Sequence, residues 1–101
     1  MAPPFWIIMY YVYVLQSQKS DFIYIGSTED LKKRFNEHNK LQNKSTKLYA
    51  PFSLIYYEAY ADKRDAVTRE YKLKYHGSAI GHLKKRLLYS ILKGRGVAQF
   101  G

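Results

Sequence analysis

Glu70 is the residue of this 101-residue chain whose type and position first suggest chemistry. It lies in the middle of an apolar stripe that predicts one side of a helix, and the stripe is formed by Ala66, Val67 and Leu73. A carboxylate that points toward a core is costly unless it is paired or binds a metal. Two interpretations follow. Glu70 forms an ion pair with Lys74 or Arg34, or it binds a hard cation such as Mg²⁺, which accepts one carboxylate together with water and phosphate oxygens.

Two tyrosines on neighbouring predicted strands form the second chemical feature. If the loop between the strands centres on residues 18 and 19, Tyr13 lies opposite Tyr24 and Tyr11 lies opposite Gly26. Side chains directly opposite each other on antiparallel strands share a face, so the two phenols would stand side by side. The glycine beside them would leave room for a ligand or a close backbone. Taken alone, the pattern favours an ordinary aromatic pair that stabilises the sheet.

A basic pair on the first predicted helix is the third feature. Arg34 and His38 are four residues apart, share a helix face and flank the apolar stripe of Leu31 and Phe35. Both are therefore expected at the boundary between helix and sheet, with His38 at the rim of a pocket formed by the tyrosines, Arg34 and Glu70. The alternative is a solvated basic helix, since two lysines precede Arg34.

The remaining side chains exclude several kinds of site. The chain has no cysteine, which excludes disulfide scaffolds, thiolate zinc sites and cysteine nucleophiles. Seven other acids are mostly expected on loops, helix caps or exposed helix positions: Asp21, Glu29, Asp30, Glu37, Glu58, Asp62 and Asp65. A two-metal site needs several convergent carboxylates, so a site with one metal is favoured. His76 and His82 are expected on the surface.

A small α+β scaffold is predicted to position these residues. Alternating apolar and aromatic residues predict strands over residues 10–15, 22–25 and 52–59. Helices are predicted from a capping box at 27–30 to about residue 41, over about 14 residues from 62, and beyond a break at Gly77 and Gly81 where Ile80, Leu83, Leu87 and Ile91 recur. The order β-β-α-β-α-α predicts a three-stranded antiparallel sheet flanked by helices.

The length of the chain indicates the number of domains, and its net charge indicates the kind of partner. A chain of 101 residues predicts one domain with a core over about 9–92, and residues 1–8 either form an N-terminal extension or lengthen the first strand. The 17 Lys and Arg outnumber the 8 Asp and Glu, and the net charge of +9 indicates a polyanionic partner, either nucleic acid or an anionic membrane surface. No apolar stretch is long enough to cross a bilayer, so a cytoplasmic location is expected.

The candidate site residues, taken together with their spacing, resemble the signature of the GIY-YIG nuclease superfamily. Tyr11-Val12-Tyr13, ten intervening residues and Tyr24-Ile25-Gly26 are similar to its paired signature, and Arg34 and Glu70 stand where the family places its arginine and its metal-binding glutamate. The resemblance covers roughly residues 10–92. It is strongest to small single-domain bacterial members and weaker to the nuclease domain of excision-repair incision proteins, which implies a role in DNA repair.

The resemblance implies hydrolysis of a DNA phosphodiester bond with one divalent cation, Mg²⁺ or alternatively Mn²⁺. Glu70 would hold the metal, Tyr13 would act as general base on water, and Tyr24 would orient that water or share the role. Arg34 would bind the phosphate and His38 would assist. A tyrosine with a pKa near ~10 is a poor base at neutral pH, so nearby cations are expected to lower the pKa. DNA contacts are expected from Gly26, Lys32, Lys33, Lys44 and Lys47.

The chain departs from the family pattern at two places. Tyr11 replaces the glycine that opens the first tripeptide, and no asparagine follows Asn43, although many active members carry one on the last helix. Two alternatives to a nuclease therefore stay open. One is a weak or inactive nucleic-acid-binding module with the same fold. The other is a domain that docks on an acidic protein or RNA, with Glu70 in an ion pair. Under every interpretation the protein is expected to be a monomer or a weak homodimer.

Overall fold

A three-stranded antiparallel sheet forms the middle layer of the molecule in a computed structural model, which describes residues 8–40 and 46–94. The strand order is β2-β1-β3. The strands are β1 (Tyr10–Ser17), β2 (Ile23–Thr28) and β3 (Phe52–Tyr60). Both outer strands therefore leave one edge without a strand partner in the described part of the chain, and β2 is the edge that matters for the site.

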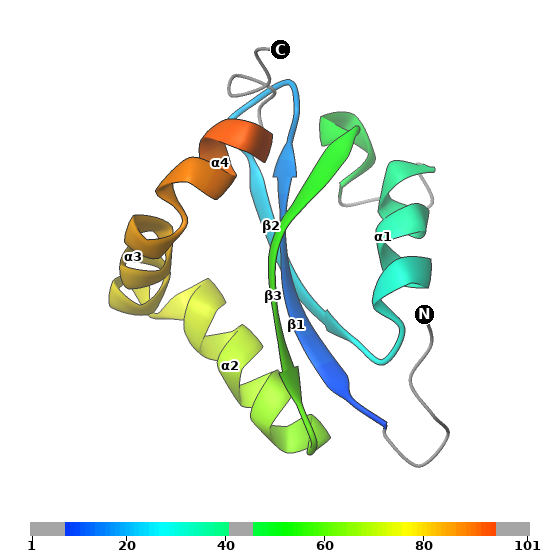
Figure 1. Cartoon of the computed structure of the whole chain (residues 1–101), viewed down its shortest axis with the longest axis vertical. Coiled ribbons are helices and arrows are strands. Elements are labelled where there is room, and N and C mark those ends of the chain that lie inside the picture. Colours follow the sequence, from blue (N-terminus) through cyan, green and yellow to red (C-terminus); the bar gives the residue numbers. More distant parts are fainter. Residues whose placement is uncertain (1–7, 41–45, 95–101) are drawn as a thin grey trace.

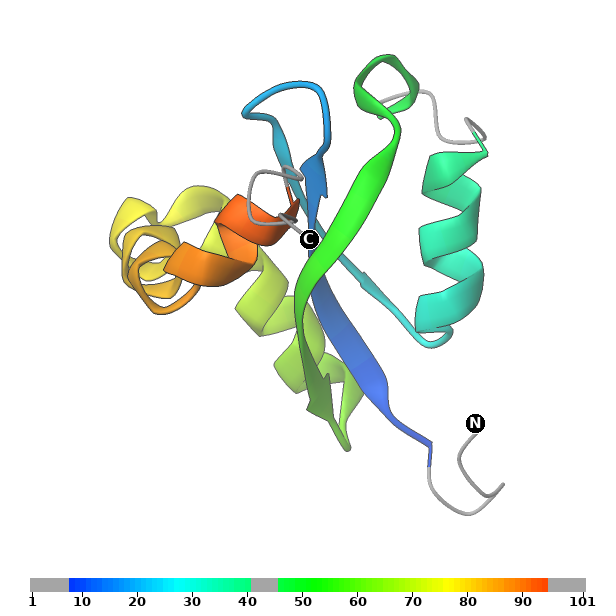
Figure 2. The ribbon, with the colours of Figure 1, turned by 45° about the horizontal axis from the view of Figure 1, so that its top comes forward.

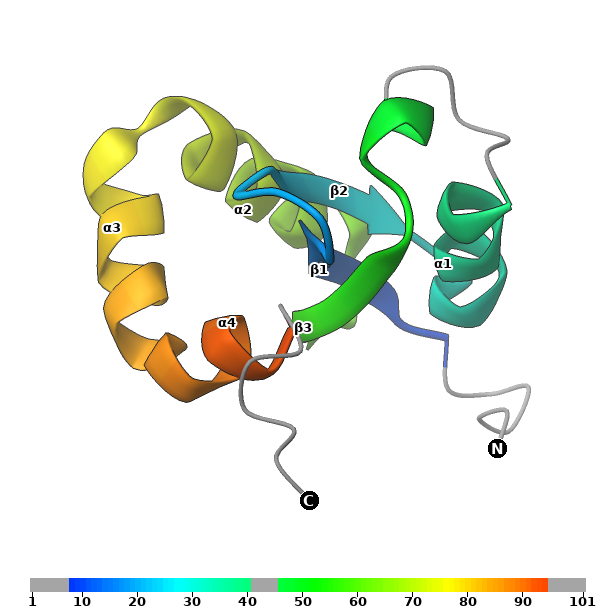
Figure 3. The ribbon, with the colours of Figure 1, turned by 90° about the horizontal axis from the view of Figure 1, so that it is seen from above.

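Helices cover both faces of the sheet. Helix α1 (Leu31–Asn39) lies alone on one side, and three helices lie on the other (Figure 1). These three are α2 (Lys63–Tyr75), α3 (Gly77–Arg86) and α4 (Leu88–Gly94). A 3₁₀ turn, η1 (Lys47–Tyr49), precedes β3 and a cis Ala50–Pro51 bond. The view from above shows the sheet enclosed between the two helical layers (Figure 3). The predicted α+β class and element order are confirmed.

The register of the β1–β2 hairpin differs from the prediction by two residues. Tyr13 pairs with Gly26, and Tyr24 pairs with Leu15. Tyr11, predicted opposite Gly26, pairs with Thr28. The reason is the turn: β1 continues to Ser17, whose N–H donates to the Phe22 carbonyl, so the loop lies one residue further along than predicted. Because the slip is even, Tyr13 and Tyr24 still face the same side of the sheet.

The helix boundaries correct three further predictions. The capping box at 27–30 is wrong, since Ser27 and Thr28 belong to β2 and Asp30 caps α1 by accepting from the Lys33 N–H at 3.1 Å. The helix ends at Asn39 and not near residue 41. Gly81 does not break a helix but lies within α3, and the region after residue 77 forms two helices instead of one.

Separate apolar clusters lie on the two faces of the sheet. On the α1 side, buried Tyr13, Leu15 and Phe52 pack with Leu31 and Phe35. The opposite cluster joins the sheet to α2 and α3 through Val12, Val14, Ile25, Ala66, Leu73, Leu83 and Leu87, and half-buried Ile91 of α4 packs against it. The predicted α2 stripe is right for Ala66 and Leu73 but wrong for Val67, which is 47% exposed. Figure 2 shows the strongly twisted sheet between these layers.

No helix within residues 8–40 and 46–94 is long and apolar enough to span a membrane.

Candidate active site

Tyr13 is the centre of a polar cluster on the α1 face of the sheet. It is 1% exposed, and its ring lies 6.1 Å from that of Tyr24 and 5.9 Å from that of His38 between centroids. The hydroxyl accepts a hydrogen bond from Arg34 Nε at 3.3 Å and is 3.0 Å from His38 Nε2. Two strands and α1 therefore hold three predicted site residues around one phenol oxygen.

Gly26 makes room for this tyrosine. A Cβ atom at residue 26 would lie 2.5 Å from the Tyr13 hydroxyl and 2.9 Å from the Tyr24 ring, closer than real contacts allow. The space that the sequence assigned to a ligand or a close backbone is thus occupied by the Tyr13 ring. Gly26 is itself buried, so its contribution is to the geometry of the two tyrosines.

His38 lies beneath the site and not at its rim. It is 0% exposed, and its Nδ1 is 2.9 Å from Thr46 Oγ1 while its Nε2 faces Tyr13. Burial lowers the pKa of His38 to about 4, and the charge of Arg34 acts in the same direction. A neutral imidazole has one donor and one acceptor nitrogen, which matches two hydroxyl partners. His38 therefore fixes the orientation of the Tyr13 hydroxyl.

The acidity of Tyr13 shifts in the direction opposite to the expected one. Burial raises the pKa of Tyr13 to about 12, and this outweighs the hydrogen bond and the positive charge of Arg34, which lower it. The cations expected to lower this pKa were Arg34 and the metal ion together. Arg34 alone does not lower the pKa, because removing the phenolate from water costs more than one guanidinium returns. The contribution of the metal ion stays a prediction. The free protein keeps the proton on Tyr13 at neutral pH.

Arg34 connects this cluster to solvent. Its Nη1 donates to Glu37 Oε1 at 3.2 Å, and 35% of its side chain is exposed. The hydrogen bond to Tyr13 is the main cause of a raised Arg34 pKa, so the guanidinium stays charged. One side of the group is thus fixed by Tyr13 and Glu37, and its exposed part is available to an anion.

Glu70 approaches from the other face of the sheet. Its Oε1 accepts from the Ser27 hydroxyl at 2.6 Å, and its Oε2 is 2.8 Å from Lys74 Nζ. The predicted ion pair with Lys74 is present, whereas Arg34 pairs with Glu37 instead. The Glu70 side chain is 21% exposed, so it faces neither the core nor bulk solvent.

The two halves meet around the edge strand β2. Lys74 Nζ lies 5.8 Å from the centre of the Tyr24 ring, which links the Glu70 side to the tyrosine side. The negative charge of Glu70 also contributes to raising the pKa of Tyr13. Ser27 and Gly26 are neighbours on β2 and face opposite sides. This strand therefore carries contacts to both halves of the site.

The donor set is compatible with a single Mg²⁺ ion. Among the described residues, no three His, Asp or Glu side chains gather into a metal cluster. Mg²⁺ needs only one or two carboxylates when water and phosphate oxygens complete its shell. Glu70 has two of about four lone-pair positions in use, one toward Ser27 and one toward Lys74. Glu70 can therefore bind one Mg²⁺ ion once Lys74 has moved away from Oε2.

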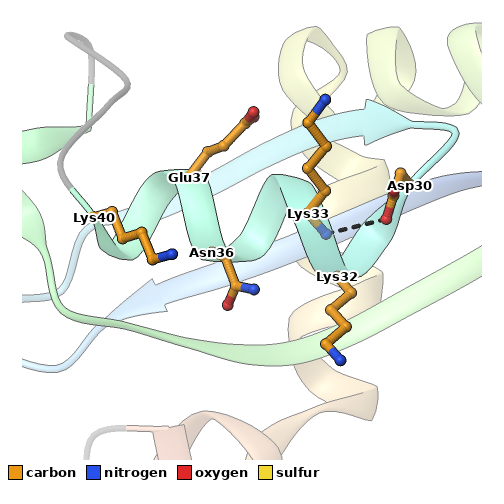
Figure 4. A pocket seen from close by; sticks show the side chains of 6 residues that line it. All are labelled: Asp30, Lys32, Lys33, Asn36, Glu37 and Lys40. Carbon is orange, nitrogen blue, oxygen red and sulfur yellow. Dashed lines mark hydrogen bonds between the residues drawn. The ribbon is translucent and has the colours of Figure 1, made fainter.

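The lysines expected to contact DNA lie on exposed surfaces. Lys32, Lys33 and Lys40 line the outer side of α1 in a shallow pocket together with Asp30, Asn36 and Glu37 (Figure 4). Lys47 is exposed in η1. Lys44 lies outside the residues that the structure describes. His76 and His82 are exposed, as predicted.

Sequence reasoning missed Ser27 and Thr46, the partners of Glu70 and His38. No local pattern marks Ser27, because its partner is 43 residues away. The burial of His38 did have a signal, since it is three residues after Phe35 and seven after Leu31 and so shares their helix face.

The comparisons with known proteins identify the family of the chain. A family model described as the GIY-YIG catalytic domain matches residues 9–86, so the chain belongs to the GIY-YIG nuclease family. The chain is similar to a UPF0213 protein of Clostridium perfringens strain 13, with 40% identity over 67 residues that cover 65% of this chain and 71% of that protein. A UPF0213 protein of Staphylococcus saprophyticus is 36% identical over 66 residues, covering 64% and 79%. No solved structure shows a significant match.

Proposed function

We propose that this protein is a metal-dependent endonuclease that hydrolyses DNA phosphodiester bonds with one cation. The observation that carries the proposal is the joining of two half-sites at the β2 edge. One holds Tyr13, Arg34 and His38 around a shared phenol, and the other holds Glu70 against Ser27. We assign the chain a single domain and a role in DNA repair in the cytoplasm, as a monomer or weak homodimer.

Glu70 and Ser27 would hold Mg²⁺ or Mn²⁺. When bound, the cation supplies Lewis-acid polarisation of the phosphate, stabilises the leaving oxygen and favours a deprotonated phenol nearby. Ser27 donates to Oε1 and so fixes the rotation of the carboxylate. Lys74 neutralises Glu70 in the free protein and keeps a partly buried carboxylate from being left unpaired.

Tyr13 is the assigned general base, with Tyr24 orienting the attacking water or sharing the role. The Tyr13 oxygen accepts an N–H from Arg34. We assign its own proton to His38 Nε2, which is 3.0 Å away, and the His38 Nδ1–H to Thr46 Oγ1, which is 2.9 Å away. This chain fixes the tautomer of His38 and the torsion of the Tyr13 hydroxyl. Tyr24 is half-buried and closer to solvent, which suits contact with water.

Arg34 is the assigned phosphate ligand. Its planar guanidinium can bind a phosphate through two N–H groups, and its contacts with Tyr13 and Glu37 hold that plane before substrate arrives. Positive charge that is already in place where the phosphate gains charge stabilises the transition state. Lys32, Lys33, Lys44 and Lys47 are assigned to the DNA backbone, where they add affinity that falls with salt.

A panel of duplex, single-stranded, flap and branched DNAs tests the proposal. The purified chain is incubated with Mg²⁺ or Mn²⁺, with and without chelator, beside Glu70→Ala. We expect nicking by the wild type that chelator stops, at least ~10³-fold slower nicking by the variant, and equal or slightly tighter DNA binding by the variant. A Glu70→Ala protein that cuts at the wild-type rate contradicts the proposal.

A nucleic-acid-binding module without cleavage is the second candidate. The Lys74 ion pair and the raised pKa of Tyr13 favour it, because both oppose the catalytic state. Under this alternative the wild type binds the same DNAs and cuts none of them with any metal.

A further inference from the structure

Two tyrosines on α2 form an exposed aromatic pair outside the candidate active site. Tyr71 is 57% exposed and Tyr75 is 69% exposed, although tyrosine is usually half-buried or better when it only stabilises a fold. Their ring centroids are 4.9 Å apart at 50°, and His76 lies edge-on to Tyr71 at 5.9 Å. The rings therefore support each other at the surface and leave much of their area uncovered.

The aromatic pair lies on α2, the helix that also carries Glu70 of the candidate active site. Tyr71 and Tyr75 form one i,i+4 row on α2, and Glu70 and Lys74 form another. Because each tyrosine directly follows one of the charged residues, the aromatic row lies about 100° around the helix axis from the charged row. Exposed Val67, one turn before Tyr71, extends the apolar row. Both rows lie on α2, so a strand with a phosphate near Glu70 lies within about one helix diameter of these rings.

The charges around the rings favour nucleic acid as the occupant. Between residues 66 and 76 the only acid is Glu70, which is paired with Lys74. The cations in the same stretch are Arg69, Lys72 and Lys74, of which Arg69 is turned to Glu58. Lys72 is therefore the cation of this stretch that has no acidic partner among the described residues. Exposed aromatic rings beside such a cation suit unpaired nucleotides, because bases stack on the rings while the cation contacts the backbone.

We propose that Tyr71 and Tyr75 form a stacking platform for an unpaired base of the nucleic-acid strand that enters the site. The proposal rests on the proposed function and narrows its substrate class to single-stranded, flap or branched DNA. In an intact duplex the base faces are stacked within the helix, so they cannot reach the platform.

Binding measured by fluorescence anisotropy tests the platform without depending on cleavage. The probes are a short oligothymidylate, an abasic strand of equal length and a duplex. Tyr71→Ala/Tyr75→Ala should weaken oligothymidylate binding by roughly 5- to 140-fold, the loss expected for one stacked base. Binding of the abasic strand and the duplex should be unchanged. Tyr71→Phe/Tyr75→Phe keeps the rings and should bind like the wild type.

Tyr89→Ala is the matched control, because Tyr89 is also a helical tyrosine and is 80% exposed. It should leave all three affinities unchanged. Equal oligothymidylate binding by the double alanine variant and the wild type overturns the proposal, and so does an equal loss for all three probes. These outcomes would leave metal-dependent nicking by the wild type intact, whereas absence of nicking with normal base-dependent binding refutes only the nuclease.

Discussion

Two polar clusters of the molecule share four residue types, each with two tyrosines, one arginine and one glutamate. On the α2–α4 face, Glu58 accepts from Tyr56 at 2.6 Å and from Tyr60, and Arg69 Nε and Nη2 bind both its oxygens at 3.0–3.1 Å. At the β2 edge, Glu70 contacts neither tyrosine and not the arginine, and is bound by Ser27 and Lys74. The two tyrosines and the arginine thus all bind the glutamate in the Glu58 cluster, whereas none of the corresponding residues binds Glu70 at the β2 edge.

The difference shows that the hydrogen bonds between the side chains, and not the residue types, distinguish a structural cluster from a candidate site. The Glu58 carboxylate has all of its oxygen lone pairs in use, and its hydrogen bonds hold β3 to α2. A metal cation could bind Glu58 only by displacing Arg69. Glu70 retains free acceptor capacity, and the exposed part of the Arg34 guanidinium remains available to a phosphate.

Removing one phenolic oxygen from each cluster should give the largest contrast. Tyr13→Phe keeps the ring and its packing but deletes the assigned base, so nicking should fall by about 10²–10⁴-fold. Tyr60→Phe removes the corresponding hydroxyl from the Glu58 network and should leave the rate within about twofold. Single-turnover rates under saturating metal measure both. A Tyr13→Phe enzyme with full activity would move the base to Tyr24 or His38.

Stability should show the reverse contrast. Glu58→Gln should lower the free energy of unfolding by about 2–3 kcal/mol, since it leaves a half-buried Arg69 without its anion. Glu70→Gln should change it by no more than about 1 kcal/mol, because that ion pair is more exposed. Each variant removes one negative charge, so the effect on net charge is matched. Urea unfolding of both variants beside the wild type measures these free energies. Equal losses of unfolding free energy in the two variants would contradict the distinction between the two clusters.

The clusters should also lose stability in different pH ranges. The pKa of His38 is about 4 when folded, against 6.5 in the unfolded chain, so the unfolded state binds more protons between these values. This contribution, on the order of 2 kcal/mol, is complete above pH 6.5 and is lost as pH falls toward 4. Unfolding curves of the wild type and His38→Gln should converge over that range. An unchanged difference between them would mean that His38 is not buried in its neutral form.

Glu58 supplies the second pH range. Burial raises its pKa, but hydrogen bonds from Arg69, Tyr56 and Tyr60 outweigh burial and lower the pKa overall. Its stabilisation is therefore complete above the ordinary glutamate range and is lost as pH falls below that range, at lower pH than most of the His38 contribution.

Local patterns predicted much of the fold. Alternation of apolar and aromatic residues located all three strands, and the spacing of Leu83, Leu87 and Ile91 located the helices that pack on the second face. Boundaries and register were less predictable, because they depend on contacts between distant residues. Ser27 was expected at a helix cap but stays in β2, where its hydroxyl binds Glu70.

The candidate site was predictable in its members but not in its layout. Residue types and spacing singled out Tyr13, Tyr24, Arg34 and Glu70. They could not reveal that Glu70 reaches the β2 edge from the opposite face, because helical periodicity gives the direction of a side chain and not the layer on which its helix packs. The Glu58 cluster was missed for a related reason. Its signal was the alternation of Tyr56, Glu58 and Tyr60 on one face of β3.

The division of the site between two layers also determines when it can exist during synthesis. Tyr13, Tyr24 and Arg34 leave the ribosome early, whereas Glu70 arrives with α2, after β3 has been made and can pair with β1. A nascent chain that stops before α2 carries the assigned phosphate ligand and base but no carboxylate for the metal. Under the proposed function, cleavage cannot begin until translation has supplied the second layer, so truncated products are harmless to DNA.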